Sequence, residues 1–169
     1  MLNQLTKNLF LTAAASSLLT VAPVSAASNS LSVKPAESPA NNSLVQNTGA
    51  NEYFQQGFNL AVQDDKTGAE TAFRRAIQID PNFAEAYANL GSLLANQNKL
   101  ADAISNLQTA IRLKPNSPEF HYMFGQVLYA QNKMSEALES VKKARDLFRS
   151  QGKSQEANSL EQVIRNMTK

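Results

Sequence analysis

Apolar and polar positions between residues 50 and 149 follow a pattern that repeats at an offset of about 34 residues. Each unit contains two apolar stripes with the spacing of helices that are covered on one face, and a polar turn separates the two. The positions that match across the units are Tyr53, Tyr87 and His121; Gly57, Gly91 and Gly125; Leu60, Leu94 and Leu128; Ala69, Ala103 and Ala137; Phe73, Leu107 and Val141; and Ala76, Ala110 and Ala144. Each unit therefore predicts a pair of α-helices.

The middle unit, residues 84–117, shows the pattern most clearly. Its first apolar stripe runs over Tyr87–Leu94, and its second runs over Ala103–Leu113. Pro115 then ends the second helix, because proline lacks an N–H donor and restricts the residue before it. Pro81 ends the preceding unit in the same way.

A glycine recurs in the middle of each first helix, as at Gly91. Glycine inside a helix costs about 1 kcal/mol relative to alanine, so a recurring one needs a compensating reason. We expect the two helices of each unit to approach closely here, with a small residue of the second helix, such as Ala103, opposite the glycine.

Residues that end and begin helices separate the predicted stripes. Gln97–Lys99 and Gln131–Lys133 fill the turns inside the second and third units with nearly identical residues. Three pairs have the spacing of a capping box, in which a polar residue before the helix is followed three residues later by an acid. These pairs are Thr67 with Glu70, Asn82 with Glu85, and Asn116 with Glu119.

An aromatic residue, a glycine, a leucine, alanines and a closing proline at this spacing are the signature of one repeat family. The chain resembles the tetratricopeptide-repeat family over about residues 50 to 148. The resemblance implies an all-α fold, a right-handed α-solenoid of three helix-turn-helix repeats. We place the repeats at residues 50–83, 84–117 and 118–151, and a C-terminal capping helix at residues 152–169.

The capping helix is predicted from Ser154 to Met167. Ala157, Leu160 and Ile164 lie on one of its faces, and its opposite face is polar. The open end of a solenoid needs such a polar outer face to remain soluble.

Residues 1–26 have the features of a cleaved secretory signal peptide. Lys7 gives a short positive region, Leu9–Val21 is apolar, and Val24–Ala26 fits an A-x-A-like cleavage site. The apolar run is shorter than the roughly 20 residues that a membrane-spanning helix needs. We expect cleavage after Ala26, or one residue later, and no membrane span in the mature chain; an uncleaved anchor is the alternative.

A signal peptide predicts an exported protein in a periplasm or comparable lumen, or a secreted one. The chain contains no cysteine, so packing alone must hold the fold, without disulfides or thiolate metal sites. Residues 27–49 are rich in Ser, Asn, Pro and Ala and lack apolar periodicity. Such a composition predicts a disordered linker.

The charge balance argues against nucleic acid as a partner. The formal net charge of the whole chain is +2, and removal of residues 1–26, which contain Lys7 and no acid, lowers it to +1. The basic clusters Arg74–Arg75 and Lys142–Arg145 alternate with acids on helix faces, as solvated surfaces do.

The sequence offers little for catalysis. His121 is the only histidine, and it stands at the position of a packing aromatic, so no His or Cys set for a metal site exists. The glycine-rich phosphate loop and the G-x-S-x-G nucleophile motif are absent. We therefore expect no enzyme activity, no cofactor and no metal.

In the family that this chain resembles, the first helices of successive repeats line a concave groove that binds peptides. Some members grip a carboxyl terminus there with basic residues and asparagine; in this chain only Asn89 matches, so that mode is not expected. The resemblance instead points to an uncharged, largely aromatic groove for a peptide with hydrophobic anchors. Its predicted site residues are Phe54, Phe58, Asn89, Ser92, Tyr122, Met123, Gln126 and Tyr129.

The leading functional hypothesis is a non-enzymatic adaptor or scaffold of the cell envelope that binds a protein or peptide partner in this groove. We expect a monomer or a weak homo-oligomer. Two alternatives remain open at this point: a self-assembling structural component, and an assembly factor for an envelope machine such as a pilus or a secretion complex. In a further variant of self-association, the linker of residues 27–49 packs into the groove of its own chain.

Overall fold

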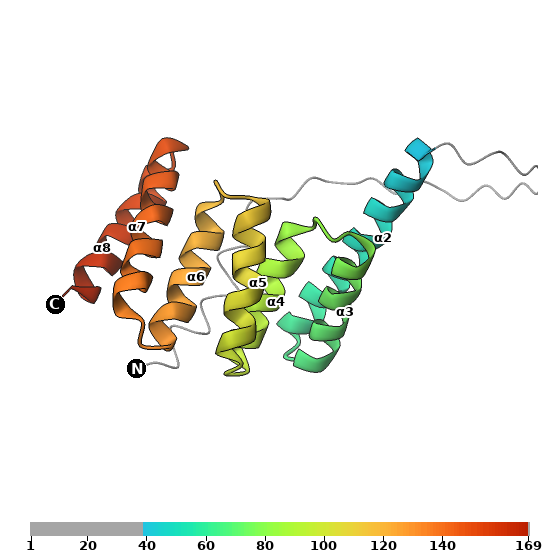
Figure 1. Ribbon diagram of the computed structural model, residues 1–169, viewed down its shortest axis with the longest axis horizontal. Helices are drawn as coiled ribbons and strands as arrows, with labels where there is room; N and C mark the ends of the chain where they lie inside the picture. The colour runs from blue at the N-terminus through green and yellow to red at the C-terminus, as the bar shows by residue number, and fades with distance from the viewer. Residues whose placement is uncertain (1–38, 169) are drawn as a thin grey trace, which may run out of the picture.

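The computed structural model describes residues 39–168, with side chains described from Gly49 onward. Those residues form seven α-helices and contain no strand. The helices are α2 (Pro39–Val62), α3 (Lys66–Ile79), α4 (Ala84–Asn96), α5 (Leu100–Leu113), α6 (Pro118–Ala130), α7 (Met134–Ser150) and α8 (Ser154–Met167) (Figure 1). The expected signal peptide, residues 1–26, and residues 27–38 of the expected linker lie outside the described residues.

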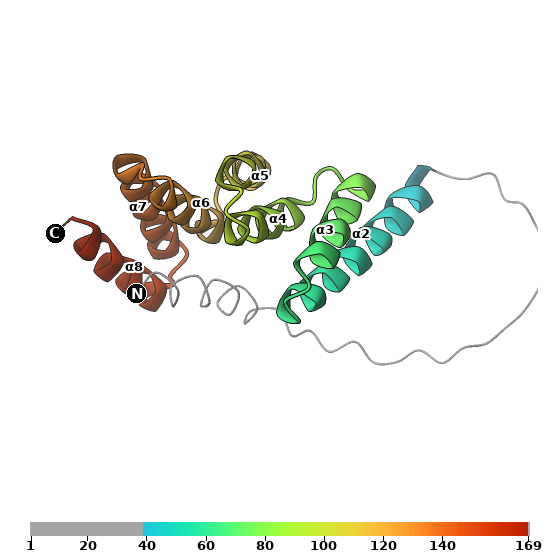
Figure 2. The same ribbon diagram turned by 90° about the horizontal axis from the view of Figure 1, so that it is seen from below.

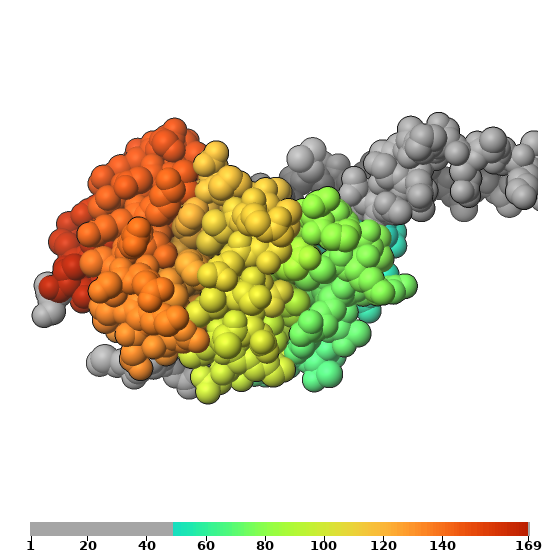
Figure 3. All heavy atoms as spheres, viewed as in Figure 1, coloured from blue at the N-terminus to red at the C-terminus, as the bar shows by residue number. Residues whose placement is uncertain are grey.

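The helices pack as three consecutive hairpins, α2–α3, α4–α5 and α6–α7, and α8 packs on α7. The second helix of each hairpin contacts the first helix of the next, through α3–α4 and α5–α6. In Figure 2 the stack forms an arc, with α4 on its inner side and α5 on its outer side. Figure 3 shows the outer face, where atoms of α3, α5 and α7 lie toward the viewer. The predicted all-α solenoid with a capping helix is confirmed.

Helix α2 begins earlier than we expected. It starts at Pro39, so residues 39–49 are helical rather than part of an irregular linker. Proline is compatible with the first turn of a helix, because its missing N–H would have no partner there. The polar composition of this stretch hid the helix, since it offers no apolar stripe to detect.

The close approach predicted at the recurring glycine is confirmed. A Cβ atom added to Gly91 would lie 2.8 Å from Leu107 Cγ and 3.1 Å from the carbonyl oxygen of Ala103, and Ala103 is fully buried. The third repeat has the same geometry, since a Cβ on Gly125 would lie 2.8 Å from Val141 Cγ2. The first helix of each hairpin therefore lies against its second helix with no room for a methyl group.

The turns inside the repeats also share one geometry. Asp64, Asn98 and Asn132, which are in register, all have φ of 62°, the left-handed conformation that asparagine and aspartate tolerate better than most residues. At the second turn the backbone N–H of Lys99 donates to the carbonyl of Leu94 at 2.9 Å, which satisfies a carbonyl at the helix end. The polar turn residues are therefore required by backbone conformation.

The predicted capping residues are wrong. Asp65 caps α3 by accepting from the N–H of Gly68 at 2.9 Å, Ser117 caps α6, and α4 has no side-chain cap. Before α4, the carboxylate of Asp80 accepts from the N–H of Asn82 at 2.9 Å. This Asx turn holds Asn82 before the helix, so the helix begins one residue later than the capping-box spacing suggested.

The capping helix completes a second apolar cluster. Ala157, Leu160 and Ile164 of α8 pack against Val141, Ala144 and Phe148 of α7. Beside this cluster, Arg145 donates to Glu161 at 3.1 Å. The C-terminal end of the solenoid is therefore closed by packing and by an ion pair, as the predicted apolar face of this helix required.

Glu70 joins the first two repeats on the outer face. Its carboxylate accepts from Arg74 at 2.9 Å and lies 3.4 Å from Lys99, which belongs to the turn of the second repeat. Burial alone raises the pKa of Glu70, but the hydrogen bonds and charges of Arg74 and Lys99 outweigh it and hold that pKa below its ordinary value. The ionised form is thus favoured in the folded state.

We expect Gly91→Ala to destabilise the protein by about 1–3 kcal/mol, the usual cost of overpacking, despite the better helix propensity of alanine. Gly49→Ala in α2 is the matched control, because its Cβ would meet only Ile79 Cδ1, at 3.8 Å. Urea unfolding followed by circular dichroism measures both. Equal stability of the two variants would contradict the close-approach account.

We expect Glu70→Gln to lower stability at pH 7 and to have a much smaller effect near pH 3. A carboxylate whose pKa is lowered in the folded state stabilises that state above its ordinary pKa, about 4.5, and the contribution is lost as the pH falls through the lowered value. Thermal unfolding at the two pH values measures the difference. Glu139→Gln, on an exposed position of α7, should show no such pH dependence, and a parallel change in both variants would argue against the Glu70 cluster.

Candidate functional site

The predicted site residues lie on the three first helices α2, α4 and α6. Phe58, Ser92 and Gln126 occupy one register position of the repeat, and Phe54 and Tyr122 occupy another. Because the hairpins stack in order, residues in register form columns across the inner side of the arc. The structure therefore places the candidates on one face, but it buries them to very different degrees.

Tyr129, Phe58 and Asn89 keep accessible surface and lie outside both apolar clusters. Tyr129 is 45% exposed near the end of α6, and Phe58 and Asn89 are half-buried. The side-chain amide of Asn89 donates to the backbone carbonyl of Glu85 at 2.9 Å. That bond fixes the side chain and leaves its carbonyl oxygen as an acceptor.

Phe54 has a large packing role. Its ring centroid lies 5.8 Å from that of Phe73 and 4.9 Å from that of Phe83. Tilted aromatic pairs at these distances are favourable, so Phe54 helps to hold α2 against α3 and against the turn that leads to α4. Only part of its half-buried ring can contribute to a binding surface.

Tyr122 is half-buried against the C-terminal apolar cluster of Val141, Phe148 and α8. Burial raises the pKa of its hydroxyl, and a hydrogen bond with Gln126 offsets part of that effect. The phenol therefore stays neutral at physiological pH. Tyr122 links the inner face to the capping helix.

The expectation that Met123 and Ser92 face solvent is wrong. Met123 is 8% exposed within the main apolar cluster, and Ser92 is 4% exposed. Both lie on helices that contact each other directly, α4 and α6, so residues between these helices are covered. The hydroxyl of Ser92 and the side-chain carbonyl of Gln126 have no hydrogen-bond partner among the described residues. Buried polar groups are rarely left unpaired, which makes this junction unusual.

Two ion pairs whose acids, Glu85 and Glu119, are in register border the inner face. Glu85 pairs with Lys114, which follows α5. Glu119 lies 3.5 Å from Lys153, which precedes α8, and accepts from the hydroxyl of Ser117 at 2.8 Å. The register of Glu85 with Glu119 is the sequence signal that could have indicated these ion pairs. The paired lysines give no such signal, because they come from different parts of the repeat. These acids are neutralised locally and leave the aromatic positions without a competing charge.

No group of three or more metal-ligating side chains occurs within residues 39–168. The ring of His121 is half-buried, and its Nε2 lies 2.9 Å from the carbonyl oxygen of Pro115. A carbonyl only accepts, so Nε2 must carry the proton and donate it. None of the described helices is long and apolar enough to cross a membrane.

The comparisons with known proteins agree with this geometry. Residues 91–132 match the family described as TPR repeat, and residues 72–105 match the family described as tetratricopeptide repeat. Residues 72–132 therefore carry tetratricopeptide repeats, and the described part of the chain is a solenoid of three helix-turn-helix repeats of this type with a capping helix. Among curated proteins there is no match.

Solved structures with a similar fold include TPR domains of other proteins. The TPR2B domain of yeast Sti1, in a pHsp70 complex, shares 22% identity with a TM-score of 0.68 and covers 72% of this chain and 97% of its own. The first TPR of Spaghetti, bound to the HSP90 peptide SRMEEVD, shares 19% identity with a TM-score of 0.63 and covers 73% of this chain and 96% of its own.

The fold also occurs inside a larger enzyme. The O-GlcNAc transferase of Thermobaculum terrenum is 25% identical with a TM-score of 0.59, and the match covers 60% of this chain but only 20% of that one. These likenesses describe the fold, which by itself assigns no activity.

Proposed function

We propose that this protein is an exported, non-enzymatic adaptor of the cell envelope that binds a protein or peptide through the inner face of α2, α4 and α6. The observation that carries the proposal is the set of accessible side chains on that face. Tyr129, Phe58 and Asn89 combine apolar rings with one oriented amide. The compartment rests on the predicted signal peptide at residues 1–26, and an uncleaved anchor would keep the same domain at a membrane.

The chemistry of this face favours a peptide with uncharged anchors. None of the eight candidate residues is charged, and the acids Glu85 and Glu119 at its border are already paired with lysines. Recognition sites of this kind are mostly apolar, with a few polar groups that fix orientation. Separate hydrophobic or aromatic side chains of the partner would contact Phe58 of the first repeat and Tyr129 of the third, and a backbone N–H between them would donate to the Asn89 oxygen.

Peptide complexes of similar domains support the class of ligand. The Spaghetti domain is described with an HSP90 peptide and the yeast Sti1 domain with pHsp70. The HSP90 peptide SRMEEVD is acidic, whereas the inner face of this chain offers no basic candidate residue. We therefore infer the same kind of surface with a different, uncharged specificity.

We expect the triple variant Phe58→Ala, Asn89→Ala and Tyr129→Ala to retain about tenfold less of the partner in affinity capture than the unmodified protein. Aromatic residues that become buried on binding commonly contribute most of the binding energy. These positions are chosen because substitution of Phe54 or Tyr122, whose rings pack against other residues, would risk unfolding the protein. The measurement is quantitative mass spectrometry of proteins retained from an envelope extract, with helicity checked by circular dichroism.

The matched control is the double variant Lys142→Glu and Lys143→Glu, on exposed positions of α7. It changes charge on the outer side without touching the inner face, and it should retain the same partners as the unmodified protein. Equal losses from both variants, or none from either, would refute binding through the inner face.

A further inference from the structure

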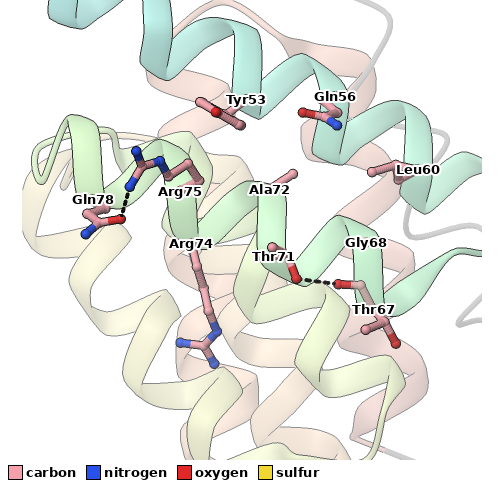
Figure 4. A pocket seen from close by; sticks show the side chains of 10 residues that line it. All are labelled: Tyr53, Gln56, Leu60, Thr67, Gly68, Thr71, Ala72, Arg74, Arg75 and Gln78. Atoms are coloured by element: carbon pink, nitrogen blue, oxygen red, sulfur yellow. Dashed lines mark hydrogen bonds between the residues drawn. The ribbon is translucent and has the colours of Figure 1, made fainter.

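A second surface lies at the N-terminal end of the solenoid, in an open hollow of about 780 Å³ between α2 and α3 (Figure 4). Helix α2 lines it with Tyr53, Gln56 and Leu60, and α3 with Ala72 and Arg75. All of its lining residues belong to the first hairpin, and none comes from the second repeat. None of these residues belongs to the predicted binding site.

The register of the repeats indicates what kind of element fits this hollow. The residues equivalent to Gln56 and Leu60 in the second repeat are Leu90 and Leu94, which are 1% and 0% exposed. They lie in one apolar cluster with Ala69 and Phe73 of α3, the helix that precedes them. Helix α3 thus packs in front of α4, and α5 packs in front of α6, but no described helix packs in front of α2. The shape that fits is a helix.

The residues that line the hollow are more polar than their equivalents in the interior of the other repeats. Gln56 stands where the second and third repeats have Leu90 and Phe124. The floor remains apolar, with Leu60 and the nearly buried Ala72, while Tyr53 is 37% exposed at the rim. An apolar centre with a polar and aromatic rim is characteristic of a surface that binds a separate chain reversibly.

The positive charge of Arg75 at the rim favours a partner with acidic groups. Arg74 is paired with Glu70, whereas Arg75 has no ion pair in the described part of the chain. The guanidinium of Arg75 lies 5.9 Å from the ring centroid of Tyr53 and donates to the side-chain carbonyl of Gln78. Arg75 is therefore held over the hollow with its charge uncompensated, and it complements an acidic group.

We propose that the hollow between α2 and α3 is a docking site for an acidic amphipathic helix of a partner protein, which would occupy the place that α3 takes in front of α4. The apolar face of that helix would contact Leu60, Ala72 and the ring of Tyr53. Its carboxylates would reach Arg75 at the rim. This site is separate from the inner face and does not depend on the function proposed for it.

Two synthetic 14-residue helical peptides test the proposal. They share one face of leucine and alanine, and the polar face carries glutamates in one and lysines in the other. Fluorescence anisotropy with the purified protein should show that the glutamate peptide binds the more tightly. Arg75→Glu should weaken the glutamate peptide about tenfold or more and strengthen the lysine peptide. Gln56→Leu, which introduces the residue type of the second repeat, should tighten both.

Two controls keep this result specific. Arg112→Glu makes the same charge change on the exposed side of α5 and should leave both affinities unchanged. The Phe58, Asn89 and Tyr129 variant of the inner face should also bind normally, so failure of one site is distinguishable from failure of the other.

Three outcomes would overturn the proposal. If neither peptide binds, the hollow is only the solvated end of a solenoid. If Arg75→Glu and Arg112→Glu reduce binding equally, the attraction comes from overall charge. If light scattering shows concentration-dependent association that Arg75→Glu abolishes, the occupant is a second copy of this chain.

Discussion

The close approach of the two helices in each repeat is the constraint on which the rest of the structure depends. With glycine at Gly91 and alanine at Ala103, the two helices of the middle hairpin touch along their backbones, and Leu107 fills the space beside the glycine. The same contact recurs in the third repeat. Because core packing tolerates little change in volume, this contact fixes how each hairpin is assembled and allows identical units to stack.

Regular stacking in turn determines what each face can do. Residues at one register position become a column on the inner side, and neighbouring columns lie beside one another, so Phe58 and Tyr129 can contribute to one surface although they belong to different repeats. The same regularity leaves the two ends unequal. Helix α8 closes the C-terminal end with an apolar cluster, while the N-terminal end keeps a hollow beneath Tyr53 and Arg75. Both proposed binding surfaces are consequences of one repeating contact.

The sequence predicted the hairpins, the glycine contact and the capping helix, because all three are encoded by short spacings that repeat. It did not predict the burial of Ser92 and Met123, which depends on how closely α4 and α6 approach across the arc. It also placed helix caps wrongly at Asn82 and Asn116. The Asx turn of Asp80 and the cap formed by Ser117 replace them, and both depend on local backbone geometry that residue spacing does not reveal. The sequence does contain a sign of the hollow, because Gln56 replaces an apolar residue of the other repeats. Recognising it as a possible binding surface required the structure, which shows how neighbouring helices pack.

The central claim is that the inner face of the first helices contacts the partner. Site-specific photo-cross-linking in cells tests it most directly, with a benzoylphenylalanine residue placed at Tyr129 in one strain and at Lys142 in another. The account predicts a discrete cross-linked partner from position 129 and none from position 142, which lies on exposed α7. A partner captured from position 142 alone would contradict it and would assign recognition to the outer face.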